Sequence, residues 1–125
     1  MKMLIEKALP LKALSMSATS DKACKGHPGN MHLWWNRSPI DSSAALLRAI
    51  IENTSSDGQC DSKIAPEIIA ELINIANGTN EKITCLNGDD YPIICEPFSG
   101  FGGLAIAAQK IGLNVQAGDL NAVAT

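Results

Sequence analysis

The sequence is poor in aromatic residues, carries little net charge and has no long apolar run. Aromatic side chains make up 4% of its 125 residues, and the formal net charge is −3. No apolar run approaches the roughly 20 residues that a membrane-spanning helix needs, so we expect no membrane span. The weak acidic charge excludes a protein that is basic over its whole surface and binds nucleic acid by charge alone.

The amino-terminal segment lacks the pattern of a signal peptide. Residues 1–14 place lysines and a glutamate among the apolar residues, where a signal peptide has an uninterrupted apolar region. We therefore expect a cytoplasmic protein.

The chain also lacks closely spaced pairs of cysteines. Its four cysteines are Cys24, Cys60, Cys85 and Cys95. No two of them have the C-x-x-C spacing of a structural zinc site. Cys24 lies near His27 and His32, but three such residues do not complete the four ligands of zinc. We therefore predict four reduced thiols and no metal.

The remaining composition is that of a folded domain. Apolar residues make up 46% of the chain and charged residues 18%, and the length fits one ordinary domain. The two halves differ in charge, since residues 1–62 carry +1 and residues 63–125 carry −4. Any contact with DNA phosphates is therefore expected in the first half.

The first half is predicted to be mainly helical. Residues 3–14 indicate a short helix or extended arm that Pro10 interrupts, and the polar residues 15–30 indicate a loop. Residues 41–53 predict a helix, with Asp41 or Ser42 as its N-cap. Its expected buried face consists of Ala45, Leu46, Ala49 and Ile50.

A further helix is predicted over residues 66–76. Pro66 suits the first helical position, and Asn77-Gly78 is typical of the end of a helix. Its expected apolar stripe consists of Ile68, Ile69, Leu72, Ile73 and Ala76. We assign residues 1–62 to an amino-terminal helical segment that contains two tryptophans, and residues 63–90 to this helix and a linker.

The last third, residues 91–125, predicts a βαβ unit and therefore an α/β fold. Residues 91–95 form a short apolar run typical of a buried strand, with Cys95 expected in the core. A glycine-rich turn and a helical pattern over residues 104–111 follow, and Gly112 ends that helix. A second strand is expected over residues 115–118, so the order is that of parallel strands joined by a helix.

The glycine-rich turn is the candidate binding site. Gly100, Gly102 and Gly103 allow the backbone to turn tightly and to approach a ligand closely, and the first amides of the helix can face its polar groups. Asp119 follows the second strand, 19 residues after Gly100, where a carboxylate can accept from ribose hydroxyls. The G-x-G-x-x-G pattern is not met in full, because Ala105 holds its last position, where the pattern tolerates alanine. From the residues alone, an NAD- or nucleotide-binding domain and a non-catalytic interaction module remain alternatives.

Two motifs resemble a known family. Pro97-Phe98-Ser99-Gly100-Phe101-Gly102 looks like the P-F-x-G-x-G loop of DNA amino-methyltransferases, and residues 118–124 resemble the segment after their second strand. The first half is similar to the N-terminal domain of unknown function in large adenine-specific DNA methylases. That similarity rests on Leu4-Ile5-Glu6, Ala8-Leu9-Pro10-Leu11, Gly26-His27-Pro28, His32-Leu33-Trp34-Trp35, Arg37 and Pro39.

This resemblance implies an incomplete Rossmann-like methyltransferase that binds S-adenosylmethionine and methylates adenine N6 or cytosine N4. The cofactor-binding residues would be Glu96, Pro97, Phe98, Gly100, Gly102, Asp119, Leu120 and Asn121. Glu96 stands where the family usually has Asp. A candidate lid over the cofactor comprises Trp35, Arg37 and Pro39, with plain packing of Trp34 and Trp35 as the alternative.

No catalytic residue is expected in this chain. The family's (Asp/Asn/Ser)-Pro-Pro-(Tyr/Phe) motif grips the flipped target base, and the chain has no Pro-Pro pair. We therefore expect a truncated chain that is inactive alone, lacks a C-terminal catalytic part and meets DNA through the complete enzyme. Self-association into a homo-oligomer is the other expected interaction, because two strands make a poor sheet by themselves.

Overall fold

The computed structural model describes residues 5, 9–20, 27, 30, 37–55, 66–79 and 91–124. Within these residues the chain forms an α/β mixture of four helices and two strands. In chain order they are α2 (Leu11–Ser20), α3 (Ile40–Ser55), α4 (Pro66–Ala76), β1 (Ile94–Glu96), α5 (Gly103–Lys110) and β2 (Val115–Ala117). None of the helices described is long and apolar enough to cross a membrane.

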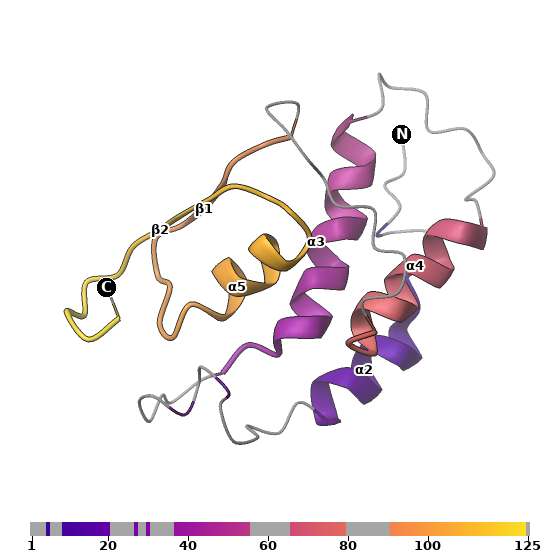
Figure 1. The fold of residues 1–125 in the computed structure, drawn as a ribbon, viewed down its shortest axis with the longest axis horizontal. Coiled ribbons are helices and arrows are strands. Elements are labelled where there is room, and N and C mark those ends of the chain that lie inside the picture. The colour runs from indigo at the N-terminus through magenta and orange to yellow at the C-terminus, as the bar shows by residue number, and fades with distance from the viewer. Residues whose placement is uncertain are drawn as a thin grey trace.

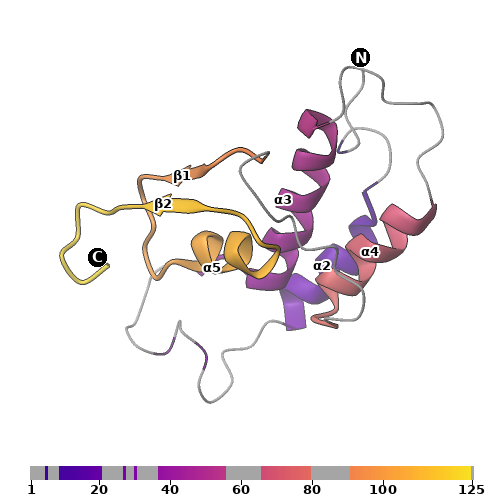
Figure 2. The same ribbon diagram turned by 45° about the horizontal axis from the view of Figure 1, so that its top comes forward.

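Helix α3 lies at the centre of the described molecule. It packs against α2 and α4 on one side and against α5 on the other, and the small sheet lies beyond α3 next to α5 (Figures 1 and 2). The core is one continuous cluster drawn from the four helices and from Ile111 and Leu113, which lie between α5 and β2. The glycine-rich turn is thus attached to the helical half through α5.

Small residues let α3 approach its neighbours closely. Ala44 and Ala49 are fully buried, and Ala45 is 1% exposed. The predicted buried face was partly wrong, because Ile50 is 41% exposed while Ile51 is buried. Since α3 contacts helices on two sides, its buried surface is wider than a single amphipathic stripe.

The predicted N-cap of this helix was also wrong. The helix begins at Ile40, so Asp41 and Ser42 already lie inside its first turn. Ser42 is buried, and its Oγ donates to the carbonyl oxygen of Leu14 at 3.0 Å. Its hydroxyl therefore ties α3 to α2 instead of capping α3.

Helix α2 replaces part of the predicted loop. The chain is helical from Leu11, directly after Pro10, and the Leu14 amide donates to the Pro10 carbonyl at 3.0 Å. Leu14 and Ser17 are both 8% exposed, one turn apart on the face toward the core. Packing against α3 and α4 thus outweighs the weak helix preference of its serines and threonines.

Helix α4 has the predicted bounds. Gly78 follows it with a φ of 70°, the left-handed conformation in which glycine ends helices. Leu72 and Ala76 of the expected stripe are buried, and Ile75, which was not predicted, is fully buried as well.

The two strands form a parallel sheet in which Ile94 pairs with Val115, Cys95 with Gln116 and Glu96 with Ala117. Strand β1 begins and ends later than predicted. Cys95 is exposed, so its expected place in the core was wrong. Helix α5 packs against both strands. Because successive side chains of a strand point to opposite faces of the sheet, Cys95 points away from the face that carries the half-buried Ile94 and Glu96.

Candidate functional site

The glycine-rich turn joins β1 to α5. Gly100 has a φ of 52° and Gly102 a φ of 80°, both in the left-handed region that glycine adopts without strain. The Gly102 amide donates to the Ser99 carbonyl at 2.7 Å, and the Ile106 amide donates to the Gly102 carbonyl at 2.8 Å. The turn therefore leads directly from the end of β1 into the first turn of α5.

Asp119 joins the end of β2 to this turn. Its Oδ2 accepts from the Gly100 amide at 2.8 Å, and its Oδ1 accepts from the Asn121 amide at 2.8 Å. The backbone ladder continues beyond the strands, since the Gly118 amide donates to Glu96 and the Ser99 amide donates to Gly118, both at 2.9 Å. The two sequence motifs, 19 residues apart, thus meet at the carboxyl ends of the two strands.

The hydrogen bonds also set the charge of Asp119. Donation from the amides of Asn121 and Gly100 holds the pKa of this carboxyl below its ordinary value, so it is ionised at neutral pH. An ionised carboxylate has about four acceptor positions, and the amides of Asn121, Gly100 and Leu120 occupy at most three of them. Asp119 therefore retains acceptor capacity for a ligand hydroxyl.

Glu96, the last residue of β1, supplies a second carboxylate next to the turn in the sequence. Burial raises the pKa of Glu96, and a hydrogen bond from the Ala105 backbone offsets part of that rise. Its Oε2 is buried and has no hydrogen-bond partner among the described residues. Buried polar atoms are ordinarily satisfied, so this oxygen is an acceptor suited to a donor that the chain itself does not supply.

Large apolar side chains next to the turn in the sequence are exposed. Phe98 is 76% exposed, and Leu120, next to Asp119, is 94% exposed. Pro97 and Asn121 are exposed as well. The Asn121 side chain accepts from the Val123 amide at 3.0 Å, which fixes the turn that follows Asp119. Two large apolar side chains that neighbour the site residues in the sequence are thus left unburied by the described residues.

Phe101 and Gly103 belong to the turn, but the sequence did not single them out as binding residues. The ring of Phe101 lies over Gly103, so that a Cβ atom at Gly103 would lie 2.5 Å from Phe101 Cζ. The second glycine of the Gly102-Gly103 pair is the signal that no side chain fits there. The contact of Phe101 with His27, with ring centroids 6.3 Å apart, carries no local signal in the sequence.

The candidate lid is only partly within the described residues. Trp34, Trp35, Cys24 and His32 lie outside them. Arg37 is exposed, and neither of two ion pairs between described side chains, Arg48–Glu71 and Lys110–Asp41, includes it. The described part of the chain holds no group of three metal-ligating side chains.

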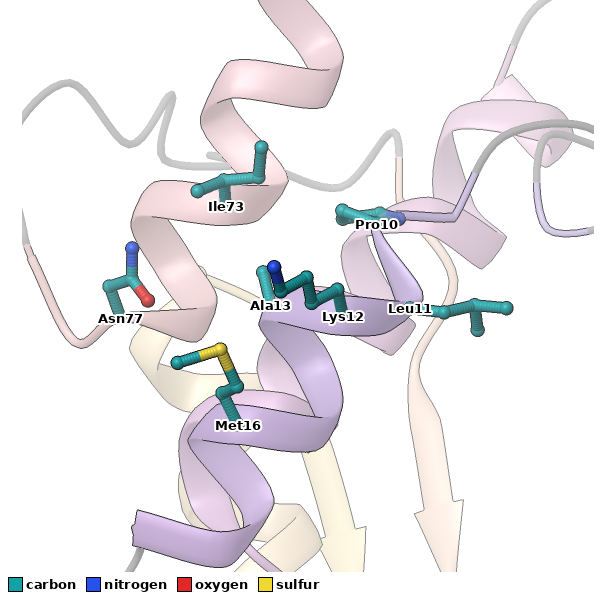
Figure 3. Close-up of a pocket in the computed structure, with 7 residues that line it drawn as sticks. All are labelled: Pro10, Leu11, Lys12, Ala13, Met16, Ile73 and Asn77. Carbon is teal, nitrogen blue, oxygen red and sulfur yellow. The ribbon is translucent and has the colours of Figure 1, made fainter.

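A separate groove lies between α2 and α4, away from the glycine turn (Figure 3). It has a volume of about 520 Å³ and is lined by Pro10, Leu11, Lys12, Ala13, Met16, Ile73 and Asn77. Its walls are mostly apolar and bring no carboxylate, histidine or cysteine together. The chemistry of the described residues is therefore concentrated at the glycine turn.

Comparison with known proteins identifies the first half of the chain. Residues 8–72, more than half of the sequence, match the family described as "Protein of unknown function (DUF1156)". No curated protein and no solved structure matches the chain. The matched residues span α2 and α3 and reach into α4, which agrees with the expected domain of unknown function, and they end before the glycine turn. The chain belongs to the DUF1156 family of proteins of unknown function.

Proposed function

We propose that this chain is the cofactor-binding N-terminal portion of a DNA amino-methyltransferase that acts on adenine N6 or cytosine N4. The observation that carries the proposal is the hydrogen bond from the Gly100 amide to Asp119, which unites the two motifs at the carboxyl ends of parallel strands. Ligands of open α/β sheets bind at this edge, at the first turn of a βαβ unit. The proposed fold is accordingly the start of a Rossmann-like domain.

The donor set at the turn fits S-adenosylmethionine. The remaining acceptor positions of Asp119 suit ribose hydroxyls, and the Oε2 atom of Glu96 suits an amino group. Phe98 and Leu120 offer apolar cover for a purine ring. When bound, the cofactor supplies the methyl group, and the role of these residues is to hold and orient it.

The lid remains part of the proposal. Arg37 is exposed and precedes α3, so its guanidinium is available for a carboxylate such as that of the cofactor's methionine end. Trp35 and Pro39 would accompany it. DNA would be bound by the complete enzyme, in the cytoplasm, with the target base gripped by a catalytic part that this chain does not contain.

Calorimetric titration with S-adenosylmethionine and S-adenosylhomocysteine tests the proposal. We expect both to bind the chain and Asp119→Asn to weaken binding roughly tenfold or more, because a hydrogen bond to a charged group contributes about 1.5–3 kcal/mol. Asp41→Asn is the matched control, since Asp41 lies in α3 and pairs with Lys110. Circular dichroism of each variant checks that the fold is retained.

Three results would contradict the proposal. Binding of NAD without binding of S-adenosylhomocysteine would favour the dinucleotide alternative. Unchanged affinity in Asp119→Asn would remove the residue on which the argument rests. If S-adenosylmethionine, S-adenosylhomocysteine and NAD all fail to bind, a non-catalytic interaction module would explain the exposed apolar residues around the turn better than a cofactor site does.

A further inference from the structure

The glycine turn contacts a residue far away in the sequence. His27 belongs to the Gly26-His27-Pro28 motif of the first half, and its ring lies 6.3 Å from that of Phe101 between centroids, at an interplanar angle of 42°. Tilted aromatic rings at this separation attract each other. His27 as a whole is half-buried, and its Nε2 atom is buried.

Phe101 is in turn tied to the start of α5. Its Cζ, Cε1 and Cε2 atoms lie 2.5, 3.0 and 3.1 Å from the position that a Cβ atom would take at Gly103. The ring therefore sits directly on the backbone of the first residue of α5. The flanking Gly100 and Gly102 have positive φ values, so the backbone on both sides of Phe101 has an intrinsically wide choice of conformations.

These contacts point to a role for His27 beyond packing. A turn in which Gly100 and Gly102 adopt positive φ values loses much conformational entropy when it is fixed, and the Phe101 ring against Gly103 restricts its movement. We propose that His27 is a positioning residue for the glycine turn, which acts by holding the Phe101 ring over Gly103. It would thereby connect the DUF1156 half of the chain to the candidate cofactor site. Any effect of His27 on ligand binding rests on the proposed function.

Hydrogen exchange tests this role without any ligand. In His27→Ala we expect the amides of residues 99–106 to exchange about two- to tenfold faster, the loss that corresponds to an aromatic pair. His27→Phe keeps a ring and should restore the slow exchange. Gln109→Ala, an exposed side chain of α5, is the control and should leave exchange unchanged. Exchange in α3 and α4 reports whether His27→Ala still folds.

Binding of S-adenosylhomocysteine gives the second readout. We expect His27→Ala to weaken it about two- to tenfold and His27→Phe to restore it. Equal exchange and equal affinity in the wild type and His27→Ala would overturn the inference, as would failure of His27→Phe to restore either one. If the wild type binds no such ligand, the proposed function fails, and exchange alone decides the role of His27.

Discussion

At the scale of single residues, Gly102 is a position of the candidate site that is constrained by its backbone conformation alone. Its φ of 80° lies in the left-handed region, yet a Cβ atom at this residue would meet nothing within 4 Å. Gly102→Ala therefore tests backbone strain alone, and we expect it to lower the free energy of unfolding by about 1–2 kcal/mol. Thermal or urea denaturation measures this change.

Gly118→Ala is the matched control for that prediction. A Cβ atom at Gly118 also meets nothing within 4 Å, and its φ lies outside the left-handed region. We expect this variant to remain within roughly 0.5 kcal/mol of the wild type. Equal effects of the two substitutions would show that the conformation of Gly102 is not what stabilises the turn.

The sequence was informative about some single residues and not about others. The spacing of 19 residues placed Asp119 next to the glycine turn, because a βαβ unit brings both positions to the same edge. The spacing could not show that the Gly100 amide donates a hydrogen bond to Asp119. Cys95 was expected in the core, but a strand covered on one face by a helix leaves alternate residues exposed.

At the scale of elements, local signals and tertiary contacts explain which helices could be predicted. Helix α4 has the predicted bounds because Pro66 and Gly78 mark its ends within the sequence itself. Helix α2 was missed in its second half because serines and threonines hide its periodicity. Its stability depends on contacts with other helices, such as the hydrogen bond from Ser42 to Leu14. These two residues are 28 positions apart, so the sequence of α2 alone does not reveal the contact.

The pairing of α3 with α4 includes an ion pair that is largely buried. Arg48 and Glu71 lie 3.3 Å apart between Nε and Oε1, and their side chains are 7% and 12% exposed. Removing one partner of a buried pair leaves the other charge in a poorly solvated position. We expect Glu71→Ala to lower the free energy of unfolding by about 3 kcal/mol, measured by urea denaturation.

The ion pair between α5 and α3 provides the comparison. Lys110 and Asp41 also join two helices, but their side chains are 23% and 34% exposed. Solvent screens such a pair, so Lys110→Met should cost about 1 kcal/mol or less. A cost for Glu71→Ala no larger than that for Lys110→Met would show that burial does not determine the strength of the α3–α4 contact.

At the scale of the whole molecule, the family match and the glycine turn share one core. The match to DUF1156 covers residues 8–72, while α3, which lies within it, packs against α5 of the βαβ unit (Figure 1). The division into residues 1–62, 63–90 and 91–125 stays a prediction. The continuous core implies that damage to α3 will also affect the turn, even though the two are separated in the sequence.

The sheet has consequences for how whole molecules meet. Among the described residues it has two strands, so each strand has an unpaired edge, and Ile93 beside β1 is 57% exposed. Unpaired edges with apolar neighbours favour pairing between chains. We therefore expect the mass measured by light scattering to rise with protein concentration, and Ile93→Lys to reduce that rise. Ile50→Lys, at an exposed isoleucine of α3, should not. A monomer at every concentration, or equal effects of both substitutions, would contradict association through the sheet.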